Sequence, residues 1–326
     1  MPRGWYLAQG LIPLGYSSSD DEEGPCELPD GRLVCGPHGL GRCGKCCVDY
    51  SFMEEVLGHD DDSDEDEDSD ASGSEVGGEA PPGWPSMGPT LKKGTGRVFP
   101  TEFAPPSASV TPLELFSGKR NHMAVTRQVP TSLTHGQLLT SSTRYTLPND
   151  PRKGIIRTDG ACLDNGQQNP KAGWAFWHGC GPSGNLLVAS GRLEQKGPFG
   201  DDSEQTSNRA ELRAVIAALG FRYWPGEGFK TLVIATDSEY AVRGATKWAK
   251  KWVENGWVTS KSGAAKNRDL WEALLGEIER YEDEGMAVEF WRVPREWNMV
   301  ADAAAKEAAA EEKAPAEWRE VIGMNL

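Results

Sequence analysis

The chain has 326 residues, enough for one or two domains, and a formal net charge of −15. Residues 54–79 contain thirteen acidic residues and no Lys or Arg, whereas residues 151–310 contain 21 basic and 22 acidic residues, so the acidity belongs to one tract. No apolar run could cross a bilayer, and residues 1–24 resemble neither a secretory signal nor a mitochondrial presequence, so we expect no membrane association and a nuclear or cytoplasmic location.

Residues 1–150 contain little that could build a core, and we expect a mostly disordered extension. It divides into a Cys/His cluster at 26–47, the acidic tract at 54–79, and a linker rich in Pro, Ser and Thr at 80–150. Runs of like charge repel one another and stay solvated. Because Ser63 and Ser69 stand among the acids, our hypothesis is that the tract mimics nucleic acid or, when phosphorylated, docks a protein partner.

Five of the seven cysteines crowd between residues 26 and 47, with the spacing C-x2-H-x4-C-x2-C. Two close pairs of such ligands, flanked by glycines, are typical of structural zinc. The four ligands in this interpretation are Cys35, His38, Cys43 and Cys46. Two alternatives stay open: Cys26 or Cys47 replaces one ligand, or the stretch is a flexible run of reduced cysteines without metal.

Regular structure is predicted from residue 154 onward. Apolar runs and turn residues predict strands at 154–160, 172–178, 185–193, 231–236 and 287–293. Helical spacing predicts helices at 208–222, 238–254, 269–282 and 300–310. This order indicates an α/β fold with a mixed five-stranded sheet and helices packed on it, in a domain at 151–311 followed by a tail at 312–326.

Four carboxylates stand where strands end or helices begin. They are Asp159, Glu211, Asp237 and Asp302. Strand ends and adjoining helix starts lie side by side in such folds, so we expect the four to converge. Converging carboxylates need neutralisation, and Mg²⁺ prefers oxygen ligands. Two such ions about 4 Å apart can clamp the attacking and leaving oxygens of a phosphodiester.

Each acid also has a purely structural interpretation. Asp159 before Gly160 could begin a turn, and Asp237 could cap the following helix. Glu211 could form a capping box with Asn208, and Asp302 could favour its helix dipole. These are four separate explanations, whereas one metal site accounts for all four positions.

Four segments resemble the metal-binding motifs of type 1 ribonucleases H, in the same order. They are TDGAC at 158–162, SNRAELR at 207–213, ATDSEY at 235–240 and NMVADAAA at 298–305. The resemblance covers about half the chain. It implies a ribonuclease H-like fold whose metal ligands are these four acids, with Mg²⁺ as cofactor and Mn²⁺ as the alternative. It also implies hydrolysis of the RNA strand of RNA–DNA hybrids through metal-activated water, leaving 5′-phosphate and 3′-hydroxyl ends. Separately, we expect the protein to be monomeric.

Seven Lys and Arg residues lie between residues 243 and 268 against one acid, with three tryptophans among them. This pattern could form a groove for a nucleic-acid backbone, or the tryptophans could be core and the lysines a solvated rim. The resemblance favours the groove, because the segment looks like the basic protrusion that grips the DNA strand in bacterial-type members. The substrate contacts it implies are Trp248, Lys250, Lys251 and Trp252 here, Thr206 and Asn267 at a DNA phosphate, and Asn165, Ser207 and Asn208 at RNA 2′-hydroxyls.

Two features depart from the family pattern. Val253 and Glu254 stand where close relatives carry further basic residues, so the grip on DNA is shifted or weakened. The mobile loop with a His before the last Asp is also missing, although branches with a shortened loop share the R-E-x-N-x-x-A-D pattern of residues 295–302. We hypothesise that Arg295 replaces that His as a phosphate contact.

Two rival functions remain beside the hybrid-specific endoribonuclease. The first is a catalytically weak or inactive nucleic-acid-binding protein with the same fold, because fold alone does not decide function. The second keeps the fold but changes the reaction, as in related nucleases and strand transferases. The presence of all four acids argues against the first, and the basic Trp-rich segment together with Asn208 argues against the second.

Overall fold

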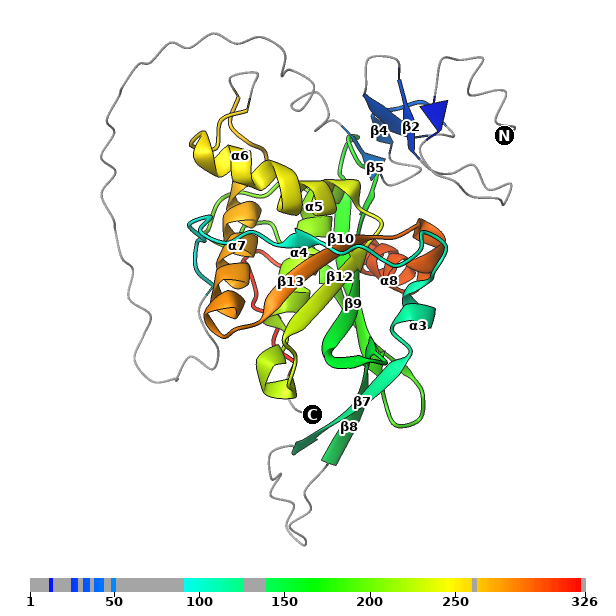
Figure 1. Ribbon diagram of the computed structural model, residues 1–326. Helices are drawn as coiled ribbons and strands as arrows, with labels where there is room; N and C mark the ends of the chain where they lie inside the picture. Colours follow the sequence, from blue (N-terminus) through cyan, green and yellow to red (C-terminus); the bar gives the residue numbers. More distant parts are fainter. Residues whose placement is uncertain are drawn as a thin grey trace, which may run out of the picture.

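The structure is a computed structural model that describes residues 12–13, 25–28, 32–35, 38–43, 48–50, 91–125, 139–259 and 263–323 (Figure 1). The acidic tract at 54–79 and Cys46 lie outside the described residues, as do Cys47 and residues 324–326. Among the helices described, none is long and apolar enough to span a membrane.

A mixed sheet forms the centre of the fold, as predicted. Five of its strands correspond to the predicted ones: β9 (Asp150–Leu163), β10 (Lys171–Cys180), β11 (Leu186–Arg192), β12 (Thr231–Thr236) and β13 (Ala287–Arg292). Strands β9, β10 and β11 form an antiparallel meander, and β12 and β13 extend it in parallel from β9. The expectation of a mixed sheet is therefore confirmed, but the sheet has eight strands rather than five.

Helices cover both faces of this sheet. They are α4 (Ser207–Gly220), α5 (Glu239–Arg243), α6 (Ala249–Glu254), α7 (Arg268–Asp283) and α8 (Met299–Ala310). The backbone of α4 lies against Gly160 and that of α8 against Gly173. Gly160 pairs with Trp174 and Gly173 with Ala161, so the two helices occupy opposite faces of β9 and β10.

The helix predicted at 238–254 is present, but it is not α-helical throughout. A π-helical turn, η2 (Gly244–Trp248), separates α5 from α6. A Cβ on Gly244 would lie 2.2 Å from Cη2 of Trp271, so this turn packs its backbone directly on the α7 tryptophan. Helical periodicity alone does not reveal one extra residue in a turn.

Part of the linker at 80–150, which we expected to be mostly disordered, has regular structure. It contains β6 (Thr101–Glu102), α3 (Pro112–Leu115), β7 (Gly118–Val125) and β8 (Leu139–Leu147). β6 pairs with β13, and β8 pairs with β7, β9 and β10. The segment between β6 and β7 packs on β13 through Phe103 and Phe116, whose ring centroids lie 5.2 and 6.3 Å from that of Trp291. The apolar pieces are too short and too scattered to show a period in the sequence.

Five short strands precede this unit. They are β1 (Ile12–Pro13), β2 (Pro25–Glu27), β3 (Leu33–Cys35), β4 (Arg42–Cys43) and β5 (Val48–Asp49). β1, β2 and β3 form one antiparallel sheet, and β4 and β5 form another.

The described part of the C-terminal tail packs on α4 and the turn after it. The ring of Trp318 lies 3.9 Å from the guanidinium carbon of Arg213, and Arg213 donates to the carbonyl of Arg319. The amide of Gly323 donates to the carbonyl of Phe221 at 2.7 Å. The tail thus adds contacts to the outer surface of this helix.

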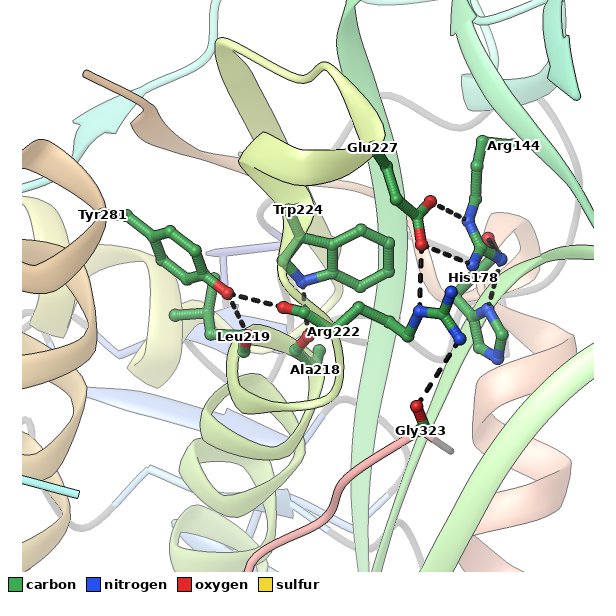
Figure 2. Close-up of polar contacts among 9 residues, drawn as sticks. All are labelled: Arg144, His178, Ala218, Leu219, Arg222, Trp224, Glu227, Tyr281 and Gly323. Carbon is green, nitrogen blue, oxygen red and sulfur yellow. Dashed lines mark hydrogen bonds and ion pairs between the residues drawn. The ribbon is translucent and has the colours of Figure 1, made fainter. Parts of the chain in front are cut away.

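A buried ion-pair network joins β8 to the predicted domain (Figure 2). Arg144 of β8 donates to both carboxylate oxygens of Glu227, at 2.8 and 3.1 Å, and Arg222 donates to the same carboxylate at 2.9 Å. Arg144 also lies 2.7 Å from Nδ1 of His178. Burial, followed by the charges of Arg144 and Arg222, lowers the pKa of His178 to about 3, so this imidazole is neutral and accepts that hydrogen bond.

We predict that Glu227→Gln destabilises the full chain by about 3–5 kcal/mol, because removing one charge from a buried pair leaves its partner uncompensated. Urea unfolding measures the change. The matched control is Glu282→Gln, whose carboxylate pairs with Arg97 at the surface and is 51% exposed, and which should change stability little. Equal effects of the two substitutions would contradict the structural role of the network.

Candidate active site

Asp159 lies in the middle of the long strand β9, not at a strand end followed by a turn. It pairs with Ala175 of β10 and is 3% exposed. The interpretation of Asp159 and Gly160 as a turn was therefore wrong. The glycine serves another purpose: a Cβ at Gly160 would lie 2.1 Å from the backbone nitrogen of Glu211. Glycine here lets α4 approach β9 closely enough to bring Glu211 beside Asp159.

Glu211 lies in the first turns of α4, and its position depends on how that helix begins. Thr206 is the N-cap, and its Oγ1 accepts from the amide of Arg209 at 3.3 Å. A capping box between Asn208 and Glu211 is thus contradicted. The Glu211 carboxylate instead accepts from the backbone of Gly160 and lies 3.5 Å from the hydroxyl of Thr236.

Asp237 follows β12 directly, and Asp302 lies in the first turns of α8. The helix after Asp237 is capped by Ser238, whose hydroxyl accepts from the amide of Ala241 at 3.2 Å, so Asp237 is not the cap. Asn298, at the start of α8, donates from Nδ2 to Oδ1 of Asp237 and to the carbonyl of Thr158, both at 2.9 Å. One amide thereby ties the middle of β9 and the end of β12 to the helix that carries Asp302.

Asn298 was not predicted as a site residue. It is fully buried, and its Oδ1 has no hydrogen-bond partner among the described residues. The signal available in the sequence was its position four residues before Asp302, at a helix start.

The four acids converge, and their charges act on one another. Burial, followed by the charges of Asp237, Glu211 and Asp302, raises the pKa of Asp159 well above its ordinary value. Burial and the charge of Asp237 likewise raise the pKa of Glu211. Such a cluster favours any cation that enters it. All four side chains offer oxygen donors, which Mg²⁺ prefers, so these residues fit that ion.

Arg295 supplies positive charge inside this cluster. It forms an ion pair with Asp302, whose other oxygen lies 3.0 Å from Nζ of Lys306. Burial alone would lower the pKa of Arg295, but the charges of Asp237, Asp302 and Asp159 raise it above its ordinary value. The guanidinium therefore neutralises part of the negative charge that a bound metal ion would otherwise neutralise.

The residues expected at RNA 2′-hydroxyls lie together beside the acids. Asn165 and Ser207 are both 2% exposed, and Asn165 donates to the Ser207 hydroxyl at 3.1 Å. Asn208 is also buried. Asn267, expected at a DNA phosphate, accepts from Arg209 at 3.3 Å and donates to the Tyr240 hydroxyl at 2.9 Å. Arg209 thus links Asn267 to the helix that Thr206 caps.

The Trp-rich basic segment divides between surface and core. Lys250 and Lys251 are exposed on α6, as expected for contacts to a nucleic-acid backbone. Trp252 is 7% exposed and packs on Trp271 with ring centroids 5.7 Å apart, so its ring belongs to the core. Trp248 is partly buried beside it, at 6.1 Å. The lysines therefore remain the better candidates for direct contact.

Three of the four predicted zinc ligands also come together. The ligand atoms of Cys35, His38 and Cys43 all lie within 4.8 Å of one another. The fourth predicted ligand, Cys46, is outside the described residues.

The mixed sheet and its flanking helices have the architecture of a ribonuclease H-like domain. A family model described as RNase H matches residues 151–310. Ribonuclease H of Treponema pallidum is 40% identical over 123 residues, which are 36% of this chain and 69% of that protein. Ribonuclease H of Pseudomonas paraeruginosa is 35% identical over 137 residues, 41% of this chain and 79% of that protein. The chain belongs to the ribonuclease H family, a family of hydrolases.

A solved structure of LC9-RNase H1, described as a type 1 RNase H with the type 2 active-site motif, is 29% identical to this chain. The match covers 48% of this chain and 72% of that one, with a TM-score of 0.34.

We predict that Gly160→Ala destabilises the chain by about 1–3 kcal/mol, because the added methyl group overpacks the contact between β9 and α4. It should also lower cleavage of a hybrid by moving Glu211. The control is Gly220→Ala in the same helix, where a Cβ meets no atom within 4 Å and stability should hold or rise slightly. Thermal unfolding compares the two variants, and equal melting temperatures would contradict the proposed role of Gly160.

Proposed function

We propose that this chain is an endoribonuclease that hydrolyses the RNA strand of RNA–DNA hybrids. The observation that carries the proposal is the convergence of Asp159, Glu211, Asp237 and Asp302 in a member of the ribonuclease H family. The relatives named above are ribonucleases H, which supports the same substrate class here.

In this proposal the four acids hold two Mg²⁺ ions, with Mn²⁺ as the alternative. When bound, such ions activate water and stabilise negative charge on the phosphodiester oxygens. The chain's own residues hold the acids in place: Asp159 and Glu211 are nine-tenths or more buried, and Asn298 orients Asp237. Zinc is proposed separately, for the Cys/His cluster.

The proposed hydrolysis adds one water molecule across the bond between phosphorus and O3′. The RNA fragments therefore end in a 5′-phosphate and a 3′-hydroxyl. Arg295 is suited to contact the scissile phosphate, because its guanidinium lies among the acids that would bind the metal ions at that phosphate.

Hybrid recognition is proposed to divide between two surfaces. Asn165, Ser207 and Asn208 lie beside the acids and offer the polar groups that can read RNA 2′-hydroxyls. Exposed Lys250 and Lys251 are proposed to hold the DNA backbone, with Trp248 and Trp252 supporting them from beneath. Thr206 and Asn267, linked through Arg209, are proposed to lie near a DNA phosphate.

The binding protein that does not cut remains the alternative function. The presence of all four acids favours cleavage, because a purely binding protein has no need to bury a cluster of carboxylates that repel one another. A monomeric state, a nuclear or cytoplasmic location, and a protein partner for the acidic tract at 54–79 stay predictions.

We predict Mg²⁺-dependent cutting of a labelled RNA–DNA duplex by the full chain, and no cutting of matched RNA–RNA or DNA–DNA duplexes. Asp237→Asn should reduce the rate on the order of 10³-fold or more, because it removes a charged metal ligand. Gel analysis of the products measures both the rate and the end groups. Tight hybrid binding without cutting by the unmodified chain would favour the binding-protein alternative.

Arg295→Ala should lower turnover about 10-fold, because a charge-assisted hydrogen bond to phosphate contributes about 1.5 kcal/mol or more. It should also lower the Mg²⁺ concentration needed for half-maximal activity, since no guanidinium competes at Asp302. Lys306→Ala is the control: it removes a more exposed cation from the same carboxylate. Unchanged turnover in Arg295→Ala would show that the arginine does not contact phosphate.

A further inference from the structure

We propose that Cys35, His38 and Cys43 form a structural zinc site that shapes the N-terminal hairpin (the described residues from β3 to β5) and holds it against the catalytic unit (the domain built on the mixed sheet). This site is separate from the acidic cluster and uses a different class of ligand.

The spacing of the three ligand atoms fits one tetrahedral ion. Zn–S and Zn–N bonds of about 2.3 and 2.05 Å place neighbouring sulfur and nitrogen atoms about 3.5 Å apart around zinc. The Sγ of Cys43 lies 3.5 Å from Nδ1 of His38, and all three atoms lie within 4.8 Å of one another. The three side chains would fill three of the four positions around the ion after small adjustments.

The chemistry of the ligands selects zinc over magnesium. Cys35 and Cys43 are 1% and 2% exposed, and neither is assigned to a disulfide. Two thiolates and an imidazole suit a borderline-soft ion, whereas Mg²⁺ takes oxygen ligands. Among the described residues of the hairpin, the other buried apolar side chains are Leu33 and Val34. So small an apolar core does not by itself explain why two thiols are buried side by side. Modules this small usually need a metal or a disulfide.

The backbone is arranged to return His38 towards Cys35. The amide of Gly39 donates to the carbonyl of Cys35 at 2.8 Å, and the amide of Cys35 donates to the carbonyl of Leu40 at 2.9 Å. Gly39 has φ +64°, with no atom within 4 Å of a Cβ placed there, so glycine is needed for its conformation and not for space. The turn between β3 and β4 therefore presents all three ligands on one side.

The same hairpin contacts the catalytic unit near the acidic cluster. Leu33 is 3% exposed and packs in the main hydrophobic core. The aliphatic part of Arg42 covers Gly166, next to Asn165. Tyr50 packs against the core, and burial, followed by the charge of Glu239, raises its pKa, with a smaller contribution from Asp237. The hairpin thus lies at the end of the site where the proposed function places the RNA strand, and this second part of the inference rests on that function.

The first test is the zinc content of the purified full chain, measured by inductively coupled plasma mass spectrometry. We expect about one zinc per chain, lost in Cys35→Ser and in Cys43→Ser. Cys162→Ser is the matched control, because Cys162 is an equally buried cysteine in the catalytic unit and its substitution should leave zinc unchanged. Asp237→Asn should lose cleavage and keep zinc, so failure of the zinc site and failure of the proposed function are distinguishable.

Cobalt substitution guards against variants that fail to fold. Co²⁺ added to the metal-stripped, unmodified chain should give a thiolate-to-cobalt charge-transfer band that Zn²⁺ abolishes. A chain that carries no zinc and gives no such band would overturn the site. Retention of zinc by both cysteine variants would overturn it equally.

Hydrogen exchange tests where the hairpin lies. Loss of zinc in Cys35→Ser should release Arg42 and raise amide exchange over residues 164–167 about 10-fold, whereas Cys162→Ser should not. Unchanged exchange over 164–167 in a variant that has lost zinc would overturn the docking part of the inference.

Discussion

Mutual repulsion among four carboxylates is the constraint around which this fold is arranged. Asp159 lies in the middle of a buried strand, where its charge is poorly solvated and three other acids oppose it. The chain tolerates this because Gly160 admits α4 at close range, Asn298 holds Asp237, and Arg295 enters the cluster as a cation. These three features hold the carboxylates close together, which favours cation binding at the cost of stability when no cation is bound.

The sequence predicted the acids and the central sheet better than the details around them. The four motifs carry residue types at spacings that the fold needs, so strands β9 to β13 and their helices were predicted within a few residues. The sequence analysis placed Asp159 and Gly160 at a turn because an Asp-Gly pair favours turns locally. In the structure the glycine is needed because α4, about fifty residues later in the chain, packs its backbone against it. Asn298 was missed because its role depends on a carbonyl and a carboxylate from two other strands.

The two metal sites proposed for this chain use different chemistry. The acidic cluster offers oxygen donors that bind ions weakly enough for phosphate and water to share them. The Cys/His cluster of the hairpin offers sulfur and nitrogen donors, which are the ligands that zinc prefers. Magnesium and zinc would therefore not compete strongly for one another's sites, and a chelator would affect structure and catalysis at different concentrations.

The strands contributed by residues 101–147 limit where the chain can be truncated without loss of structure. β6 covers the outer edge of β13, and β8 covers part of β9 and β10. A fragment that starts at residue 151, where the family match starts, would lose both coverings and leave Glu227 without Arg144. Bare strand edges pair readily with other chains. Such a fragment would therefore be prone to self-association, and its low solubility could be mistaken for a lack of activity.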